Sequence, residues 1–236
     1  MSEITFKIEE SLYDVVDNPA PAKKLVPDWY KKMSVHISDA SKMPVMPNQE
    51  SGANLSIKAC IPIQDELVSG YIITMPQDLY IFKDGSEMFT RWSDEESLLI
   101  ESHSVEQFKS SPLEKFSIGG VLFKFINPWR IYTKKGYSIK FFPPSYHDLD
   151  FEVLPGIVDT DLMHSVNFPF IWKGGDGEFI IQRGTPLVQL LPFKREKWVS
   201  NFCIQTEKEE IKQRRGFASK LAYWYRDFAH SKKHYQ

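Results

Sequence analysis

The segment 119–142 reads GGVLFKFINPWRIYTKKGYSIKFF and consists of three short apolar runs separated by turn-forming residues. The dipeptides Asn127-Pro128 and Lys135-Gly136 interrupt the runs, and residues of these types commonly mark turns. The same pattern of short runs and breaks extends over about residues 57–193. About ten short strands at this spacing are typical of an all-β barrel or sandwich and not of alternating strands and helices. The sequence therefore predicts an all-β domain at residues 57–200.

Segments of a different character flank this domain. Residues 1–56 begin with an apolar–polar alternation that predicts a short edge strand, and they continue as a proline-rich arm and a loop. Within the arm, the prolines allow one helical turn near Pro27–Met33. In 201–236, Phe217, Leu221, Trp224 and Phe228 recur at helical spacing among basic residues. We therefore predict a C-terminal amphipathic helix over 207–229.

The local structure of three further segments can also be predicted. The apolar run SIKACIPI at 56–63 predicts a strand. Residues 94–114 are acidic and then polar, and we expect a connection with one helical turn there. The segment 174–177, GGDG, predicts a hairpin turn between two strands. It is not a phosphate-binding loop, because no helix and no Lys-Ser/Thr pair follow it.

The composition excludes several classes of protein. The chain has 236 residues, 42% of them hydrophobic, and a formal net charge of -2. These values indicate a globular protein and argue against whole-surface nucleic-acid binding. Its two cysteines, Cys60 and Cys203, are too few for a disulfide framework or a Cys-rich zinc site. We find no apolar stretch long enough for a membrane span and no secretory leader, so we expect a cytoplasmic protein without membrane contact.

Three segments, taken in order, resemble the β-clip of the dUTPase and dCTP deaminase superfamily: TKKGYSIKFFPPS at 133–145, GIVDTD at 156–161 and GTPLVQLLPF at 184–193. The resemblance covers roughly residues 125–195. It implies a mainly β, β-clip-like barrel or sandwich, here with an N-terminal arm and a C-terminal helix. It also implies a homo-oligomer, with a trimer as the state common in the superfamily and with sites shared between subunits.

The whole chain is also similar to an uncharacterised protein family of T4-like marine phages and some bacteria. The similarity lies in PDWYKK, INPW, GIVDTD, VNFPF and GTPLVQLLPFKR. It implies a phage protein, located in the host cytoplasm or in the virion. This family has no assigned activity, so the similarity supplies a context and not a chemistry.

The superfamily resemblance implies two catalytic residues. Asp159 corresponds to the aspartate that orients the attacking water, and Ser145 to a serine that contacts phosphate. The same motifs supply the ligand-binding candidates Tyr137, Asp161 and Gln189. Two further positions lack the side chains that the superfamily uses for binding. Pro144 stands where the superfamily has an arginine, and Leu162 stands where dUTPases have a tyrosine. Proline offers no side-chain donor for a phosphate.

These departures lead to three functional hypotheses. The first is a phage-type accessory or structural protein that uses the β-clip for binding and assembly, without a cofactor and without turnover. The second is a Mg²⁺-dependent pyrimidine nucleotide pyrophosphatase or deaminase relative. The third is a non-haem iron and 2-oxoglutarate oxygenase, in which His147 or His164 binds iron together with carboxylates such as Asp148 and Asp150.

Each candidate also has a purely structural interpretation. Asp159 and Asp161 could accept backbone N–H groups in a turn, as aspartates in Asx turns do. The segment 147–150, HDLD, could be a solvated loop. The aromatic residues of the C-terminal helix could stack on nucleic-acid bases, but packing against the domain or against a protein partner is the interpretation we favour.

Overall fold

The computed structural model describes residues 3–37, 55–93, 99–211 and 230–235. The chain forms two compact units. Unit 1 comprises Met1–Leu25 and Gly70–Arg195, and unit 2 comprises Val26–Ser69 and Glu196–Gln236. Unit 1 contains the strands and the candidate site, whereas unit 2 contains short helices and the C-terminal segment.

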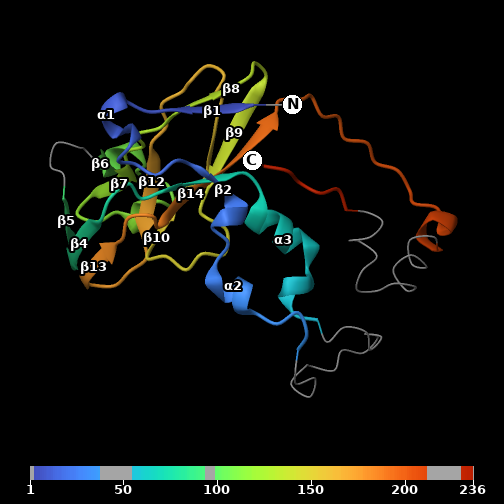
Figure 1. The fold of residues 1–236 in the computed structure, drawn as a ribbon, viewed down its shortest axis with the longest axis horizontal. Helices are drawn as coiled ribbons and strands as arrows, with labels where there is room; N and C mark the ends of the chain where they lie inside the picture. Colours follow the sequence, from blue (N-terminus) through green and yellow to red (C-terminus); the bar gives the residue numbers. More distant parts are fainter. Residues whose placement is uncertain (1–2, 38–54, 94–98, 212–229, 236) are drawn as a thin grey trace. The chain divides into compact units, whose positions relative to one another are not determined.

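Unit 1 is mainly β, as predicted, and its sheets are antiparallel (Figure 1). Among the described strands, the sheets do not close into a barrel. A short helix, α1 (Glu10–Tyr13), follows the first strand, which pairs with β8. The strands are β1 (Ile4–Lys7), β2 (Ala20–Pro21), β3 (Tyr71–Thr74), β4 (Leu79–Asp84), β5 (Glu87–Trp92), β6 (Ile100–Ser104), β7 (Val121–Phe125), β8 (Arg130–Thr133), β9 (Tyr137–Phe142), β10 (Phe151–Val153), β11 (Gly156–Val158), β12 (Phe168–Trp172), β13 (Gly177–Ile181) and β14 (Pro186–Lys194).

A five-stranded sheet brings together the three segments on which the superfamily resemblance rests. Its strand order is β11-β9-β14-β3-β2. Strand β9 lies between the other two segments, because it pairs with β11 on one side and with β14 on the other. Residues close together in this sheet are therefore far apart in the sequence. The other sheets have the orders β1-β8, β10-β12-β7-β6 and β13-β4-β5.

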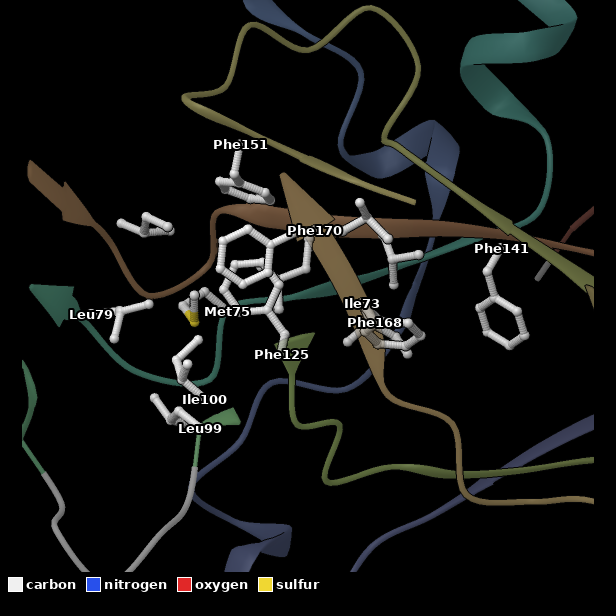
Figure 2. Packing of buried hydrophobic residues seen from close by; sticks show 14 of the residues in the cluster. Ile73, Met75, Leu79, Leu99, Ile100, Phe125, Phe141, Phe151, Phe168 and Phe170 are labelled. Atoms are coloured by element: carbon white, nitrogen blue, oxygen red, sulfur yellow. The ribbon is translucent and has the colours of Figure 1, made fainter. Parts of the chain in front are cut away.

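The core of unit 1 is rich in aromatic residues. Phe125 and Phe170 stack with ring centroids 4.0 Å apart, and Phe151 meets Phe125 edge-on at 5.1 Å (Figure 2). All three side chains are buried. They come from β7, β12 and β10, which are neighbours in one sheet, so this cluster stabilises the sheet beside aliphatic residues such as Ile73 and Leu79.

The INPW and VNFPF segments have a structural role in this core. The Asn127 side chain is buried, donates to the carbonyl of Trp129 at 2.8 Å and accepts from the N–H of Trp129 at 3.1 Å. The N–H of Asn127 donates to the side chain of Asn167 at 3.2 Å. These bonds satisfy backbone groups where β7 ends, so the turn can be buried at low cost.

Three local predictions are wrong. The run 56–63 is not a strand, because it forms a 3-10 turn, η3 (Ile57–Ala59), and a helix, α3 (Ile61–Val68), in unit 2. Ser56 caps η3 by accepting from the N–H of Lys58, and Pro62 stands in the first turn of α3, where proline is tolerated. A short apolar run cannot by itself separate a strand from a helix.

The other two errors concern connections. Within 94–114, the expected helical turn is present as the 3-10 turn η4 (Val105–Gln107). The described residues also include strand β6, which was not expected and which forms an antiparallel ladder with β7. Its polar residues face outward, so its apolar signal is weak. The segment 174–177 is not a hairpin turn, because β12 and β13 lie in different sheets. Asp176 instead accepts hydrogen bonds from the Lys83 side chain and the N–H of Gly85.

Unit 2 contains the helical turn predicted near Pro27–Met33, which is α2 (Asp28–Lys32). Lys58 links it to η3 by donating to the carbonyls of Lys31 and Met33. On α3, Asp65 accepts from Lys233 at 2.8 Å and bonds the His230 ring at 3.0 Å. The predicted C-terminal helix begins at residue 207 and is described to 211, and its aromatic stripe lies outside the described residues.

Candidate functional site

The candidate site is centred on Arg195, which directly follows β14. Its guanidinium donates through Nη1 to Asp161 Oδ1 at 2.9 Å and through Nη2 to Asp161 Oδ2. Asp161 also accepts from the N–H of Gly136 at 2.8 Å, so both of its oxygens are engaged. Only 4% of the Asp161 side chain is exposed. A bidentate arginine pair of this kind is among the stronger polar contacts in proteins and fixes the geometry of both partners.

Asp159 is the second carboxylate of the site. Ser138 on β9 donates its hydroxyl to Asp159 Oδ1 at 2.6 Å, and Arg195 Nη1 lies 3.0 Å from the same oxygen. Arg195 also donates to the Ser138 hydroxyl oxygen at 3.1 Å. In contrast to Asp161, the Asp159 side chain is 51% exposed. The site therefore combines one buried carboxylate and one accessible carboxylate on a single guanidinium.

The local backbone holds the GIVDTD segment in a turn. The carbonyl of Asp159 accepts from the N–H groups of Leu162 and Met163, both at 2.9 Å. Between the two aspartates, the fully buried Thr160 shares a hydrogen bond of 2.8 Å with the hydroxyl of Thr133. Because Thr160 points inward, Asp159 and Asp161 both reach the polar cluster.

The ionisation of both carboxylates follows from these contacts. The hydrogen bond from Arg195, together with the N–H of Gly136, lowers the pKa of Asp161 to about 2. The hydrogen bond from Ser138 is the main cause that lowers the pKa of Asp159, and Arg195 lowers it further against the opposing effect of desolvation. Asp161 in turn raises the pKa of Arg195. The three groups are therefore all charged near neutral pH, and their sum is one negative charge.

The other predicted catalytic residue lies at the opposite end of the same strands. The N–H of Ser145 donates to Gln189 Oε1 at 3.0 Å, and the Gln189 side chain is 1% exposed. Gln189 therefore anchors the segment that follows β9. At a strand rise of about 3.3 Å per residue, Gln189 and Arg195 are separated by roughly 20 Å along β14. Within one chain, Asp159 and Ser145 thus belong to two separate polar clusters.

The remaining predicted positions divide between these clusters. Tyr137 contributes its backbone carbonyl, which accepts from Arg195 at 3.1 Å. Pro144 is buried beside Ser145. Leu162 is 76% exposed and follows the Asp161 turn, so the position that carries a tyrosine in dUTPases presents an aliphatic side chain to solvent here.

Arg195 and Ser138 were not among the predicted site residues, although Ser138 lies in TKKGYSIKFFPPS and Arg195 in GTPLVQLLPFKR. Ser138 on β9 is 1% exposed and pairs with Phe193 on β14. Arg195 lies two residues beyond Phe193, on the face of the sheet from which it reaches the Ser138 hydroxyl. The signal that could have identified them is a period of two residues along each strand. It becomes informative only when the pairing of β9 with β14 is known.

Of the residues of the iron hypothesis, His164 is held by neighbouring groups. The His164 ring stacks on Tyr132 with centroids 3.9 Å apart, and its Nδ1 lies 3.1 Å from the carbonyl oxygen of Thr160. Among the residues that the structure describes, no group of three or more His, Cys, Asp or Glu side chains is arranged to hold a metal ion. The described helices also include none with the length and apolar character needed to span a bilayer.

No protein-family model matches the chain, and no curated protein matches it. One solved structure that matches is a point mutant of the dUTPase of Staphylococcus bacteriophage 80alpha. The match has a TM-score of 0.38 and 8% sequence identity, and it covers 87% of this chain and 98% of the dUTPase chain. A similarity at this score does not support an argument about function.

Proposed function

We propose that this chain is a phage-type accessory or structural protein that uses its β-clip-like unit for binding and assembly, without turnover. The observation that carries the proposal is the engagement of Arg195 by both carboxylates of the GIVDTD turn. The phage context rests on the sequence resemblance alone. On this proposal the protein acts in the host cytoplasm or in the virion.

The charge of the cluster supports a binding role over phosphate chemistry. A nucleotide substrate brings several negative charges, and its recognition needs cationic or N–H donors that are free to bind it. Arg195 is committed to Asp159 and Asp161, and the cluster as a whole is negative. Asp161 has both oxygens engaged, so it is poorly placed to take a Mg²⁺ ion.

The separation of the two predicted catalytic residues supports the same proposal. Asp159 and Ser145 belong to clusters roughly 20 Å apart along β14, so one chain does not present both to one small substrate. The Pro-Pro-Ser segment supplies no arginine that could replace the missing donor. The two polar clusters instead hold the ends of β9 and β14 in place.

One observation favours the second candidate, a pyrimidine nucleotide hydrolase. Asp159 is accessible and ionised, and Ser138 holds it by one oxygen. The contacts found among the described residues leave Asp159 Oδ2 open to a water molecule. A site of this kind would need Ser145 from another subunit, as in the sites shared between subunits that the resemblance implies. It would also need Mg²⁺ to offset the negative charge.

A panel of nucleoside triphosphates with Mg²⁺ separates the two candidates. The assay measures release of pyrophosphate and ammonia by the wild type and by Asp159→Asn. An exposed aspartate on the same unit, substituted as Asp14→Asn, serves as the matched control. We expect no turnover from any of the three proteins. Turnover that Asp159→Asn abolishes and Asp14→Asn preserves would overturn the proposal in favour of the hydrolase.

Assembly implies contacts with other chains. We propose a homo-oligomer, with the trimer as the state that the resemblance implies, and the C-terminal helix as a surface for a protein partner. The net charge of -2 argues against nucleic acid as the main partner.

A further inference from the structure

The three-stranded sheet β13-β4-β5 has one face in the core and the other in solvent. These strands lie side by side in unit 1 (Figure 1). Residues such as Leu79, Ile81 and Ile181 point inward and belong to the core cluster. The alternate positions point outward, where polar residues would be expected. Large apolar side chains stand there instead, with exposed fractions of 46% for Tyr80, 45% for Phe82, 61% for Phe89 and 55% for Ile180.

These four side chains form one continuous patch. Phe82 lies directly opposite Phe89 in the β4–β5 ladder, with ring centroids 6.4 Å apart. Tyr80, two residues along β4, lies directly opposite Ile180 in the β13–β4 ladder. At about 200 Å² per large side chain and half exposure, the patch presents roughly 400 Å² of mostly apolar surface. Patches of this size on a soluble protein commonly mark an interaction site.

Charged residues surround the patch in an asymmetric order. Arg91 lies opposite Tyr80 at one end, and Glu87 lies opposite Asp84 at the other end. Glu178 lies at the side, opposite Phe82. In the part of the chain that the structure describes, none of these four charged residues forms an ion pair with another residue. The patch therefore has one basic end and one acidic end, with the two phenylalanines midway between them.

We propose that this face is a homodimer interface, in which two copies stack their sheets about a two-fold axis that runs across the strands and over Phe82 and Phe89. This axis reverses the strand direction between the copies and keeps each strand over its own counterpart. Arg91 then faces Glu87 of the partner subunit, and Tyr80 faces Asp84 of the partner subunit. The inference rests on the proposed assembly function, because it names a second copy of this chain as the partner.

The order of charges favours a second copy over another protein. A two-fold contact is self-complementary, so one surface must carry both the donor and the acceptor of each pair. Arg91 and Glu87 meet this condition, since each lies two residues from Phe89 on β5, in opposite directions. A uniformly basic or acidic partner would match only one end of the patch.

Two consequences follow from the same geometry. The area is small for a specific interface, so the dimer belongs to the transient class and should form in the micromolar range. Glu178 lies on the edge strand β13, at the level of the two-fold axis, where it faces Glu178 of the partner subunit. This like-charge contact opposes association, and its removal should strengthen the dimer.

Sedimentation velocity of the full chain over a range of concentrations tests the interface. We expect the mass of the wild type to double as the concentration rises, starting from the monomer or from the proposed trimer. Arg91→Glu and Glu87→Arg should each raise the dissociation constant about tenfold or more, because each places like charges together. The double variant that exchanges the two charges should restore it to about threefold of the wild-type value or better. Glu178→Gln should lower it, and Arg130→Glu on strand β8 should leave it unchanged.

Three results would overturn the inference. The first is a wild type whose mass does not double at any concentration, and the second is an oligomer whose affinity neither single reversal alters. A dimer that both reversals weaken but the exchange does not restore would also overturn it, since that result assigns the face to a different partner. A wild type that never associates would count against the proposed assembly as well, whereas an oligomer that the reversals do not weaken would overturn this interface alone. The absence of turnover is tested separately by the nucleotide assay, so the failures are distinguished.

Discussion

Arg195 and Asp161 are joined by two parallel hydrogen bonds that link the end of β14 to the GIVDTD turn. The pair lies at the end of β9 that is opposite to Ser145. Arginine suits this role because its planar guanidinium matches a carboxylate in two places. The pair therefore holds the GIVDTD turn against the end of β14.

Substitution of Arg195 tests this role. Arg195→Ala leaves the nearly buried Asp161 with only the N–H of Gly136, so we expect a clear fall in the melting temperature. Arg195→Lys should recover only part of it, because an ammonium cannot form the bidentate contact. Thermal unfolding monitored by circular dichroism measures both. Equal stability of the wild type and Arg195→Ala would contradict the structural role.

The pH dependence of unfolding reports on Asp161. Its pKa in the folded chain is about 2, below its ordinary value of 3.8. A carboxylate whose pKa is lowered by folding contributes stability above its unfolded pKa and loses that contribution as the pH falls through the folded value. We therefore expect unfolding to become easier between about pH 4 and about pH 2. Asp161→Asn should make the denaturant midpoint less sensitive to pH in this interval, whereas the exposed control Asp14→Asn should not.

Much of the fold could be predicted from the sequence, because apolar runs between turn residues identify buried strands. The run at 119–142 gives β7, β8 and β9, and the alternation near the N-terminus gives β1. Strand β6 was missed because its outward positions are polar and its apolar signal is short. The residues of α3 were misassigned because a short apolar run fits either a strand or a helix.

The candidate site was only partly predictable, for a different reason. Asp159 and Asp161 are close in sequence, so one motif identifies both. Ser138 and Arg195 are 57 positions apart, and they meet only because β9 pairs with β14 in one register. A shift of that register by one residue would move Ser138 to the other face of the sheet. A contact of this kind depends on strand pairing, which the local sequence does not specify.

The aromatic core should be sensitive to truncation. Phe170 is 1% exposed and stacks on Phe125. Phe170→Ala therefore removes a buried ring and leaves a cavity that water does not fill. We expect a loss of about 3–5 kcal/mol in the free energy of unfolding. The matched control is Phe202→Ala, since Phe202 is 95% exposed and its loss should change stability by less than about 0.5 kcal/mol. Urea unfolding measures both, and similar midpoints for the two variants would show that the ring cluster contributes little.

The last prediction separates backbone strain from steric exclusion at two glycines. Gly70 has a φ of 74°, and a Cβ atom there would lie 2.0 Å from the carbonyl oxygen of Leu190 on β14. Gly136 has a φ of 87°, but a Cβ atom there would meet nothing within 4 Å. Gly136→Ala should therefore cost only the left-handed conformation, about 1–2 kcal/mol.

Gly70→Ala adds a clash with backbone that belongs to a paired strand and cannot move freely, so we expect about 3–5 kcal/mol. The start of β3 would have to shift away from β14, which would disturb the ladder that holds Gln189. Chemical denaturation gives both free energies. Hydrogen exchange at the amides of β3 and β14 should report local opening in Gly70→Ala and not in Gly136→Ala. Equal losses in the two variants would mean that β3 yields at little cost, and the close approach of Gly70 to Leu190 would then have no role in fixing the sheet.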